Sequence, residues 1–235
     1  MNNLTVNKEQ RFYGRRKGRK LSESSQIALK QGNLFYIIKL EDFFKNENNS
    51  ISQSLFEIDH KKIILEIGFG GGDNLVNSAI NNPDICYIGA DPFLNTNAKL
   101  IKILLKNDIK NIKIWPDDIR KIIPLFPSGS VSEIKILFPD PWPKSKHKNR
   151  RLVQEIFIDN LYKILVPNGK ITLATDHSLM KSWILEIFQS HKGYLWQANT
   201  ITDWQNRPAD CFSTKYEQKS FAKENIPSWF IFEKT

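Results

Sequence analysis

From residue 61 onward, short runs rich in apolar and β-branched residues alternate with longer amphipathic segments. The short runs are KKIILEIG (61–68), CYIGAD (86–91), IKIW (112–115), EIKILF (133–138) and KITLATD (170–176). Between them, apolar residues recur at helical spacing, most clearly over 73–81, 94–107 and 178–191. This repeated strand–helix–strand order predicts a parallel sheet with helices on both faces.

The rest of the pattern completes this sheet. Residues 117–126 predict one short helix, and 151–169 predict a longer helix that a proline and a glycine end. Near the C-terminus, YLWQANTI (194–201) and PSWFIFEK (227–234) predict two further strands. The predicted fold is therefore α/β: a Rossmann-like, doubly wound and mostly parallel seven-stranded sheet.

The residues before the first strand differ from this pattern. Residues 1–55 predict a basic N-terminal arm, with a leading helix near 41–45 and a polar, loop-like segment at 47–54. Residues 56–235 predict one α/β domain, a size that a single hydrophobic core supports.

Several classes of protein are excluded by composition. No apolar run approaches the roughly 18 residues that a membrane-spanning helix needs. The basic N-terminus lacks the apolar stretch of a secretory signal. The two cysteines, Cys86 and Cys211, stand far apart and outside any CxxC pattern, which indicates neither a disulfide framework nor a zinc site. We therefore expect a cytoplasmic protein that binds neither a metal nor a membrane.

Positive charge is concentrated in two places. The chain has 34 Lys and Arg against 25 Asp and Glu, a net charge of +9. The first cluster holds six basic residues within 11–20: Arg11, Arg15, Arg16, Lys17, Arg19 and Lys20. The second holds Lys144, Lys146, His147, Lys148, Arg150 and Arg151. Two such clusters indicate a polyanionic partner, most simply a nucleic acid.

A glycine-rich turn follows the first predicted strand. In ILEIGFGGGDN, Gly68 and Gly70 begin a GxGxG pattern that allows a tight turn and close approach of a ligand to the backbone. A glycine loop alone is weak evidence, since it often marks only a turn. Glu66, just before it, would repel a pyrophosphate but would stabilise a cationic or amine-bearing ligand.

Acidic residues also follow the second and third predicted strands. Asp91 ends the second strand about 20 residues after the glycine loop, a position suited to the hydroxyls of a ribose. Asp117 and Asp118 follow the third strand, and either could simply cap the next helix. We favour Asp118 as a contact to an adenine amino group, a role compatible with capping.

The fourth predicted strand ends in an aspartate between two prolines, within LFPDPWPKSKHKNRR. The simplest interpretation of Asp140 is a rigid turn. The flanking prolines also restrict the backbone, so they would hold this carboxylate in one place at the ligand edge of the sheet. Trp142 could stack on a base or be buried for structural reasons.

These acids and the glycine-lined turn favour S-adenosylmethionine as the cofactor, because its sulfonium and its ammonium are both cationic. A nicotinamide dinucleotide fits less well. Asp73 stands where the GxGxxG fingerprint has its third glycine, and no phosphate-binding arginine follows the loop.

The segments LEIGFGGG, IGAD, FPDPWPKSKHKNRR, ATDH and TKYEQK, in this order, resemble the bacterial tRNA (guanine-N7)-methyltransferase family from about residue 11 to the end. The proline-rich basic segment followed by TKYE is far more specific than the glycine loop. The resemblance implies a class I methyltransferase fold and methyl transfer from S-adenosyl-L-methionine to N7 of variable-loop guanine 46 in tRNA. The products are then 7-methylguanosine and S-adenosyl-L-homocysteine.

The resemblance also implies roles for individual residues. The cofactor-side carboxylates are Glu66, Asp91, Asp118 and Asp140. The substrate-side positions are Lys144, Asp176, Thr214, Lys215, Tyr216 and Glu217. Two residues depart from the family pattern: Asp91 stands where glutamate is usual, and Pro143 where histidine is common.

The implied chemistry needs no general base, because guanine N7 carries a free lone pair at neutral pH. Catalysis requires in-line positioning and nearby anionic groups that favour the developing positive charge. Asp140 is the predicted catalytic residue, with Asp176 also at a strand end, and Glu217 could accept from the guanine amino edge. Lys144 and both basic clusters would bind phosphates. No obligatory protein partner is predicted, and both a monomer and a homodimer remain open.

Three other functions compete with this prediction. An amino-group methyltransferase would hold an exocyclic amine at a D/N-P-P-Y turn, which DPWP resembles only loosely. A non-catalytic tRNA-binding protein would not need five acids at predicted strand ends. A nucleotide-dependent oxidoreductase agrees least with the glycine loop.

Overall fold

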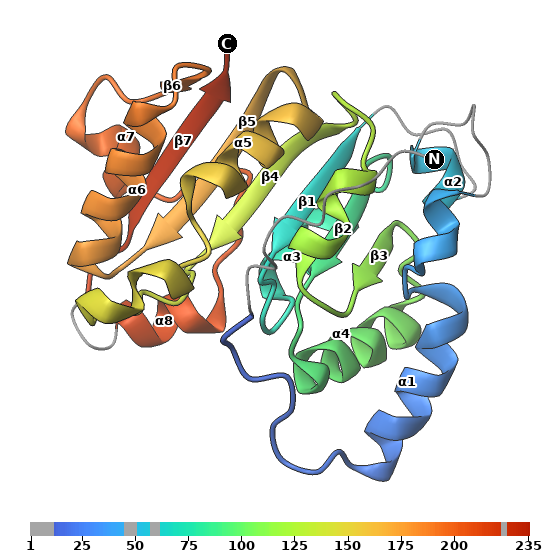
Figure 1. Cartoon of the computed structure of the whole chain (residues 1–235). Helices are drawn as coiled ribbons and strands as arrows, with labels where there is room; N and C mark the ends of the chain where they lie inside the picture. The colour runs from blue at the N-terminus through green and yellow to red at the C-terminus, as the bar shows by residue number, and fades with distance from the viewer. Residues whose placement is uncertain (1–11, 45–50, 57–61, 222–224) are drawn as a thin grey trace.

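The seven predicted strands form one sheet, with the order β3-β2-β1-β4-β5-β7-β6 (Figure 1). The computed structural model describes residues 12–44, 51–56, 62–221 and 225–235, without the side chains of 51–53. The strands are β1 (Ile63–Ile67), β2 (Cys86–Ala90), β3 (Ile112–Trp115), β4 (Val131–Leu137), β5 (Leu165–Thr175), β6 (Tyr194–Trp196) and β7 (Ser228–Lys234). Strands β1 to β5 pair in parallel, and β7 is antiparallel to both β5 and β6. The predicted α/β, mostly parallel seven-stranded sheet is confirmed.

Helices cover both faces of the sheet, as the strand–helix alternation predicts. On one face, α1 (Glu23–Phe35), α3 (Asp73–Asn81) and α4 (Leu94–Asn107) bury their apolar sides. On the other, α2 (Ile51–Phe56), α5 (Glu155–Ile164) and α6 (Ser178–Ser190) share the larger core. Neighbouring residues of β1 point to opposite faces of the sheet: Ile64 packs in the core of the first face and Leu65 in that of the second. Both sides of the strand are therefore buried.

Six short elements complete the described part of the chain. They are the 3-10 helices η1 (Leu40–Phe43), η2 (Ile119–Lys121), η3 (Ile123–Leu125) and η4 (Ser145–Arg150), and the α-helices α7 (Ile201–Gln205) and α8 (Lys215–Phe221). The carboxyl ends of the parallel strands point to the lower side of Figure 1, where the N-terminal arm and α8 also lie. The residues that follow these strands, which we predict to bind ligands, therefore lie at one edge of the sheet.

Two predicted helices in the domain were wrong in extent. The helix predicted over 151–169 ends at Ile164, and its proline and glycine lie inside β5. Strand β5 pairs with β4 at Leu165, opposite Val131, and next at Lys170, opposite Glu133. The β5 residues between Leu165 and Lys170 therefore form a bulge. The single helix predicted over 117–126 is instead two 3-10 turns, η2 and η3.

The arm is more ordered than its sequence predicts. Helix α1, which packs on α4, was not predicted, and the leading helix predicted near 41–45 is only the 3-10 turn η1. Within the segment predicted as a loop, Ile51 already begins α2, while 45–50 lie outside the described residues. The proposed boundary at residue 55 stays a prediction.

We predict that the α1–α4 contact tolerates no side chain at Gly32. A Cβ there would lie 2.5 Å from Ile101 Cγ2, and Ile101 is fully buried. Gly32→Val should therefore lower the free energy of unfolding by about 1–3 kcal/mol through overpacking. Asn33→Val, at the exposed neighbouring position, is the matched control and should change it only by a few tenths. Urea denaturation followed by circular dichroism measures both, and equal effects would contradict the prediction.

Candidate active site

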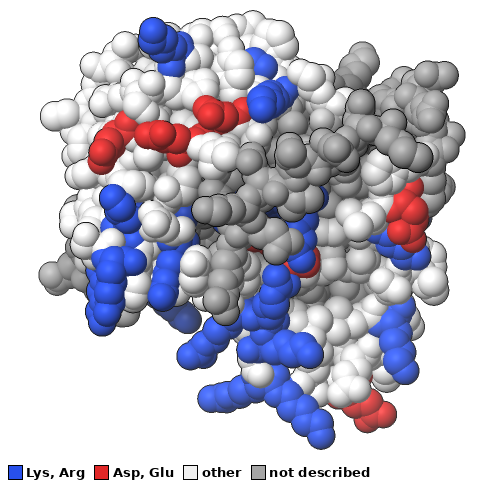
Figure 2. Space-filling view, in the orientation of Figure 1, with Lys and Arg blue, Asp and Glu red and all other residues white. Residues whose placement is uncertain are grey.

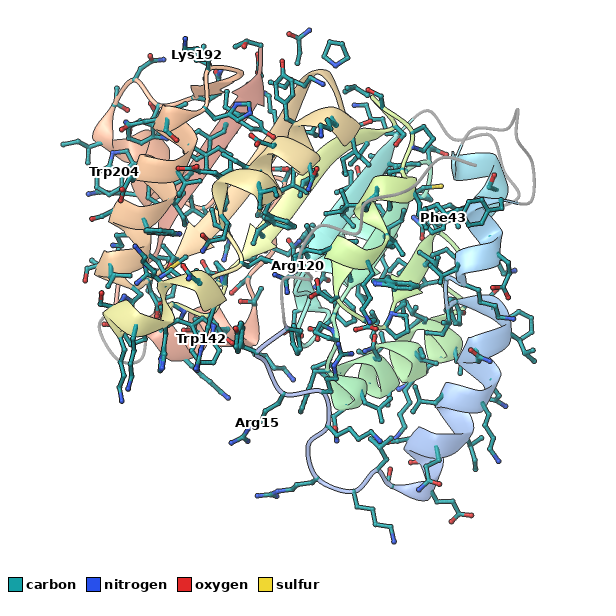
Figure 3. The ribbon with its side chains drawn as sticks, in the orientation of Figure 1. Arg15, Phe43, Arg120, Trp142, Lys192 and Trp204 are labelled. Atoms are coloured by element: carbon teal, nitrogen blue, oxygen red, sulfur yellow. The ribbon has the colours of Figure 1, made fainter. Side chains whose placement is uncertain are left out.

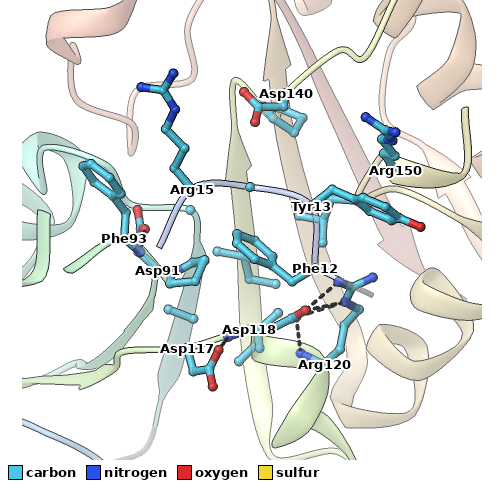
Figure 4. A pocket seen from close by; sticks show the side chains of 18 of the residues that line it. Phe12, Tyr13, Arg15, Asp91, Phe93, Asp117, Asp118, Arg120, Asp140 and Arg150 are labelled. Carbon is cyan, nitrogen blue, oxygen red and sulfur yellow. Dashed lines mark hydrogen bonds and ion pairs between the residues drawn. The ribbon is translucent and has the colours of Figure 1, made fainter. Parts of the chain in front are cut away.

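A cavity of about 290 Å³ opens at the carboxyl ends of β1, β2, β3 and β4 (Figure 4). The strand ends and the arm build it together, so its walls come from segments far apart in the sequence. Its lining includes Phe12, Tyr13, Arg15, Gly68, Asp91, Phe93, Asp118, Arg120, Asp140, Trp142 and Arg150. The cavity thus brings together four predicted cofactor-side residues, Gly68, Asp91, Asp118 and Asp140.

Asp91 is locked to the glycine loop. Its Oδ2 accepts a hydrogen bond from the Gly70 N–H at 2.9 Å, and its Oδ1 accepts from the Phe93 N–H at 2.8 Å. Gly68 and Gly70 have φ values of +78° and +52°, a conformation that favours glycine. Burial raises the pKa of Asp91, although these backbone N–H groups oppose the shift. A carboxylate fixed at the cavity wall is suited to accept from the hydroxyls of a ribose.

The third strand end carries two acids that already have cationic partners. Asp118 caps η2 by accepting from the Arg120 N–H and also forms a two-pronged ion pair with the Arg120 guanidinium (Figure 4). Asp117 pairs with Arg16 of the arm and with Lys121. Burial alone would raise the pKa of Asp117, but these cations and the Asp118 N–H lower it. The capping role expected for this pair therefore belongs to Asp118.

Glu66 lies beneath the glycine loop and does not line the cavity. Its side chain is 3% exposed, and its Oε2 accepts from Asn74 Nδ2 at 2.8 Å. Burial raises the pKa of Glu66 to about 7, opposed by Asn74 and by the Lys135 ammonium. The carboxyl group is therefore close to a neutral–anionic balance at physiological pH.

Asp140 lies exposed at the rim of the cavity. Pro139 and Pro141 flank it, and they also line a second cavity of about 450 Å³. Pro139 borders both cavities, so Asp140 lies where the two spaces approach one another. Trp142, half-buried beside it, lies on the same lower side of the molecule as Arg15 (Figure 3). This arrangement places a carboxylate between a nucleoside-sized cavity and a second, open one.

The second cavity contains the predicted substrate residues Asp176 and Tyr216. Asp176 accepts a hydrogen bond from the Ser220 hydroxyl, and the Tyr216 hydroxyl lies 3.5 Å from Asp176 Oδ1. Burial and the Asp176 charge raise the pKa of Tyr216. Its ring is 4.9 Å from that of Phe138 and is 52% exposed, so an aromatic face is open to a flat ligand.

The remaining substrate-side residues lie around α8. Thr214 caps this helix by accepting from the Glu217 N–H at 3.1 Å, and Lys215 is exposed. Glu217 is 1% exposed, and its Oε2 accepts from Arg207 Nη1 at 2.9 Å. Lys144 is exposed at the start of η4. The structure thus brings Asp176, Tyr216 and Glu217 to one region, with Glu217 facing inward.

Both basic clusters lie beside the cavities. Lys and Arg side chains gather on the lower half of the face in Figure 2, where Figure 1 places the arm and α8. The Arg150 guanidinium lies 4.8 Å from the Tyr13 ring centre and 5.1 Å from the Trp142 ring centre. The contact with Tyr13 connects the second basic cluster to the segment that carries the first. Arg11 lies outside the described residues.

Sequence reasoning missed the residues that complete these sites. Arg120, two positions after Asp118, could have been recognised as its partner from proximity alone. Arg16, Ser220 and Arg207 carry no such signal, because each meets its acid only through the tertiary fold. Within the described ranges, no helix is long and apolar enough to cross a membrane, and no three His, Cys, Asp or Glu side chains are grouped as metal ligands.

The order of the strands and the acidic, glycine-lined cavity at their carboxyl ends define a class I methyltransferase. A solved structure of an antibiotic-related methyltransferase supports this fold with a TM-score of 0.52, at 18% identity over 83% of this chain and 98% of the other. Residues 60–227 match the family model "Putative methyltransferase". The chain belongs to the tRNA (guanine-N7)-methyltransferase family, whose relatives cover nearly its full length.

Two of these relatives carry the name tRNA (guanine-N(7)-)-methyltransferase. The protein from Agrobacterium fabrum is 35% identical over 221 residues, which is 94% of each chain. The protein from Rhodospirillum rubrum is 34% identical over 224 residues, 95% of this chain and 88% of the relative. Membership of this family implies S-adenosylmethionine as the cosubstrate.

The raised pKa of Glu66 predicts a pH-dependent stability. The folded state holds this proton up to pH about 7, whereas the unfolded chain releases it near its ordinary value of 4.5. Stability from this group is therefore present below pH 4.5 and is lost as pH rises through 7, by on the order of 3 kcal/mol. Glu66→Gln should remove this loss.

Urea denaturation at pH 5 and pH 7.5 measures the effect as the difference between wild type and Glu66→Gln. Glu133, whose pKa burial also raises to about 7, is present in both proteins, so its contribution cancels. Parallel losses of stability in the two proteins would show that Glu66 is not buried as a protonated group.

Proposed function

We propose that the protein transfers the methyl group of S-adenosyl-L-methionine to N7 of the variable-loop guanine in tRNA. The observation that carries this proposal is the pair of cavities at one sheet edge, with Asp140 between them and basic residues beside them. The activity named for relatives at 34–35% identity over nearly the whole chain supports the same reaction.

The first cavity would hold the cofactor, which supplies an electrophilic methyl group on a cationic sulfur. Its volume of about 290 Å³ is near the lower end of the roughly 300–1,000 Å³ typical of ligand pockets. In this proposal Asp91 accepts from the ribose hydroxyls, and Asp118 accepts from the adenine amino group beside Arg120. Gly68 and Gly70 allow close approach, while Glu66 acts electrostatically through the loop.

The second cavity would hold the target guanine. Asp176 would accept hydrogen bonds from the base, and the exposed Tyr216 ring would stack on it. The Glu217 carboxylate, buried against Arg207 in this structure, would turn toward the cavity to accept from the guanine amino edge. Thr214 positions Glu217 through the helix cap, and Lys215 and Lys144 would contact phosphates.

The chemistry assigns Asp140 a direct role without proton removal. Guanine N7 would attack the methyl group through its lone pair, so that the N7–methyl bond forms as the methyl–sulfur bond breaks. The electron pair of the broken bond stays on the sulfur, and the positive charge passes to the base. The Asp140 carboxylate, held by its flanking prolines at the meeting point of the cavities, stabilises this developing charge and helps to align the reacting atoms. Asp176 adds a second negative charge on the substrate side.

The function is tested by incubating the purified protein with labelled S-adenosylmethionine and unmodified bulk tRNA. Label should enter tRNA, and cleavage chemistry specific for 7-methylguanine should locate it in the variable loop. Label on an exocyclic amine would instead select an amino-group methyltransferase. Tight tRNA binding without transfer would select a non-catalytic tRNA-binding protein, so either result would overturn the proposal.

We predict that Asp140→Asn reduces turnover by about 100-fold or more, because it removes the charge but keeps the shape of the rim. Binding of tRNA should change little, since the basic clusters carry it. Asp108→Asn is the matched control, because Asp108 is an exposed aspartate at the end of α4, and it should keep full turnover. Filter binding and single-turnover methylation separate the two effects. An equal loss of binding and turnover would remove Asp140 from the chemistry.

A further inference from the structure

One buried amide links the cofactor side of the site to the substrate side. Asn74 is the second residue of α3, directly after the glycine loop, and is 1% exposed. Its Nδ2 donates to Glu66 Oε2 at 2.8 Å, and its Oδ1 accepts from the Phe212 N–H at 2.8 Å. The two ends of a single side chain therefore join β1 to a backbone group 138 positions further along the chain.

The segment that Asn74 holds is the one that leads into the substrate motif. This substrate segment, residues 207–217, is attached at further points. The buried Lys135 ammonium of β4 donates to the Asp210 carbonyl at 2.8 Å and to its carboxylate at 3.0 Å. Asp73, next to Asn74, accepts from the Lys215 N–H at 3.2 Å. The start of α3 is thus shared by the glycine loop and the substrate segment.

We propose that Asn74 is a positioning residue that makes cofactor binding and tRNA binding depend on one another. This inference rests on the proposed function, because it takes Glu66 as a cofactor-side acid and 214–217 as substrate contacts. It goes beyond that function by assigning the coupling to one side chain that contacts neither ligand.

The reason lies in the burial of both hydrogen bonds. If a cationic cofactor drew Glu66 upward, Asn74 would follow or would lose its acceptor, and an unpaired amide at 1% exposure is costly. A shift of Asn74 moves the Phe212 N–H and, through the neighbouring Asp73, the start of α8. Couplings between sites of this kind typically change affinity by about 5- to 150-fold, equally in both directions.

The test is a binding cycle that needs no turnover. The dissociation constant of S-adenosylhomocysteine is measured by calorimetry with and without saturating bulk tRNA, and that of tRNA with and without S-adenosylhomocysteine. In the wild type each should tighten the other by at least about 5-fold. In Asn74→Ala the factor should fall to about one, while Asn77→Ala should retain it.

Asn77 is a matched control because it lies on the same helix, is exposed, and donates to the Asp73 carbonyl within its own helix. Absence of coupling in the wild type, or its survival in Asn74→Ala, would overturn the inference. So would a loss of both affinities with an unchanged factor, which is what a merely structural residue would give. The methylation assay above tests the proposed function separately.

A second variant separates the two hydrogen bonds and keeps the test decisive if Asn74→Ala does not fold. In Asn74→Asp, the new carboxylate still accepts from the Phe212 N–H but cannot donate to an ionised Glu66. The charges that face Glu66 are Asp73, Asp91 and Lys135, with the Cys211 thiol nearby. Coupling should be absent at pH 8 and should return at pH 5.5, where a proton shared by the two carboxyl groups restores the bond. Coupling that is unchanged between these pH values would contradict the proposed link.

Discussion

Parallel pairing of β1 to β5 is the constraint on which the site depends. Because these strands run in one direction, the residues that follow them meet at one edge of the sheet, although they lie between positions 68 and 176 of the chain. The helices that return the chain between strands also bury both faces, so this edge is where polar groups remain accessible. Glycine at 68 and 70, and proline on both sides of Asp140, then fix the strand ends in shapes that ordinary residues would not hold.

The acids at this edge differ in their partners. Asp118 meets Arg120, Asp117 meets Arg16 and Lys121, Asp176 meets Ser220, and Glu217 meets Arg207. Glu66 is kept partly neutral by burial instead. Among the described residues, no hydrogen bond or ion pair involves the Asp140 carboxylate. An exposed carboxyl group at the rim that has no such partner is the one best able to respond to charge that develops in a bound base.

Sequence reasoning predicted what local patterns determine. The strands along the chain, the ranges of α3, α4 and α6, and the acids that follow the strands all come from periodicity and turn residues that act over a few positions. Sequence reasoning was wrong where contacts between segments far apart in the chain determine the structure. The apolar residues after Ile164 continue a helical pattern, but pairing with β4 draws Leu165 into a strand. Likewise, α1 is only weakly amphipathic by sequence and gains its place by packing against α4 through Gly32. The roles of individual site residues remain proposals.

The largest gap between sequence and structure concerns the arm, which was predicted as a basic segment with a leading helix that binds RNA. Its residues Phe12 to Arg15 form part of the cavity wall, and Arg16 joins it to the third strand end. The Leu94 N–H donates to the Arg16 carbonyl, and the Gly18 N–H donates to the Asn95 side-chain Oδ1, which fixes the arm on the start of α4, just after Asp91. At its other end Tyr13 stacks on Arg150 of the second basic cluster. This segment lines the proposed cofactor cavity and also carries positive charge. Phosphate binding to it would therefore affect the cavity as well. In the proposed function, residues 12–20 would therefore contribute both to nucleic acid binding and to enclosure of the cofactor.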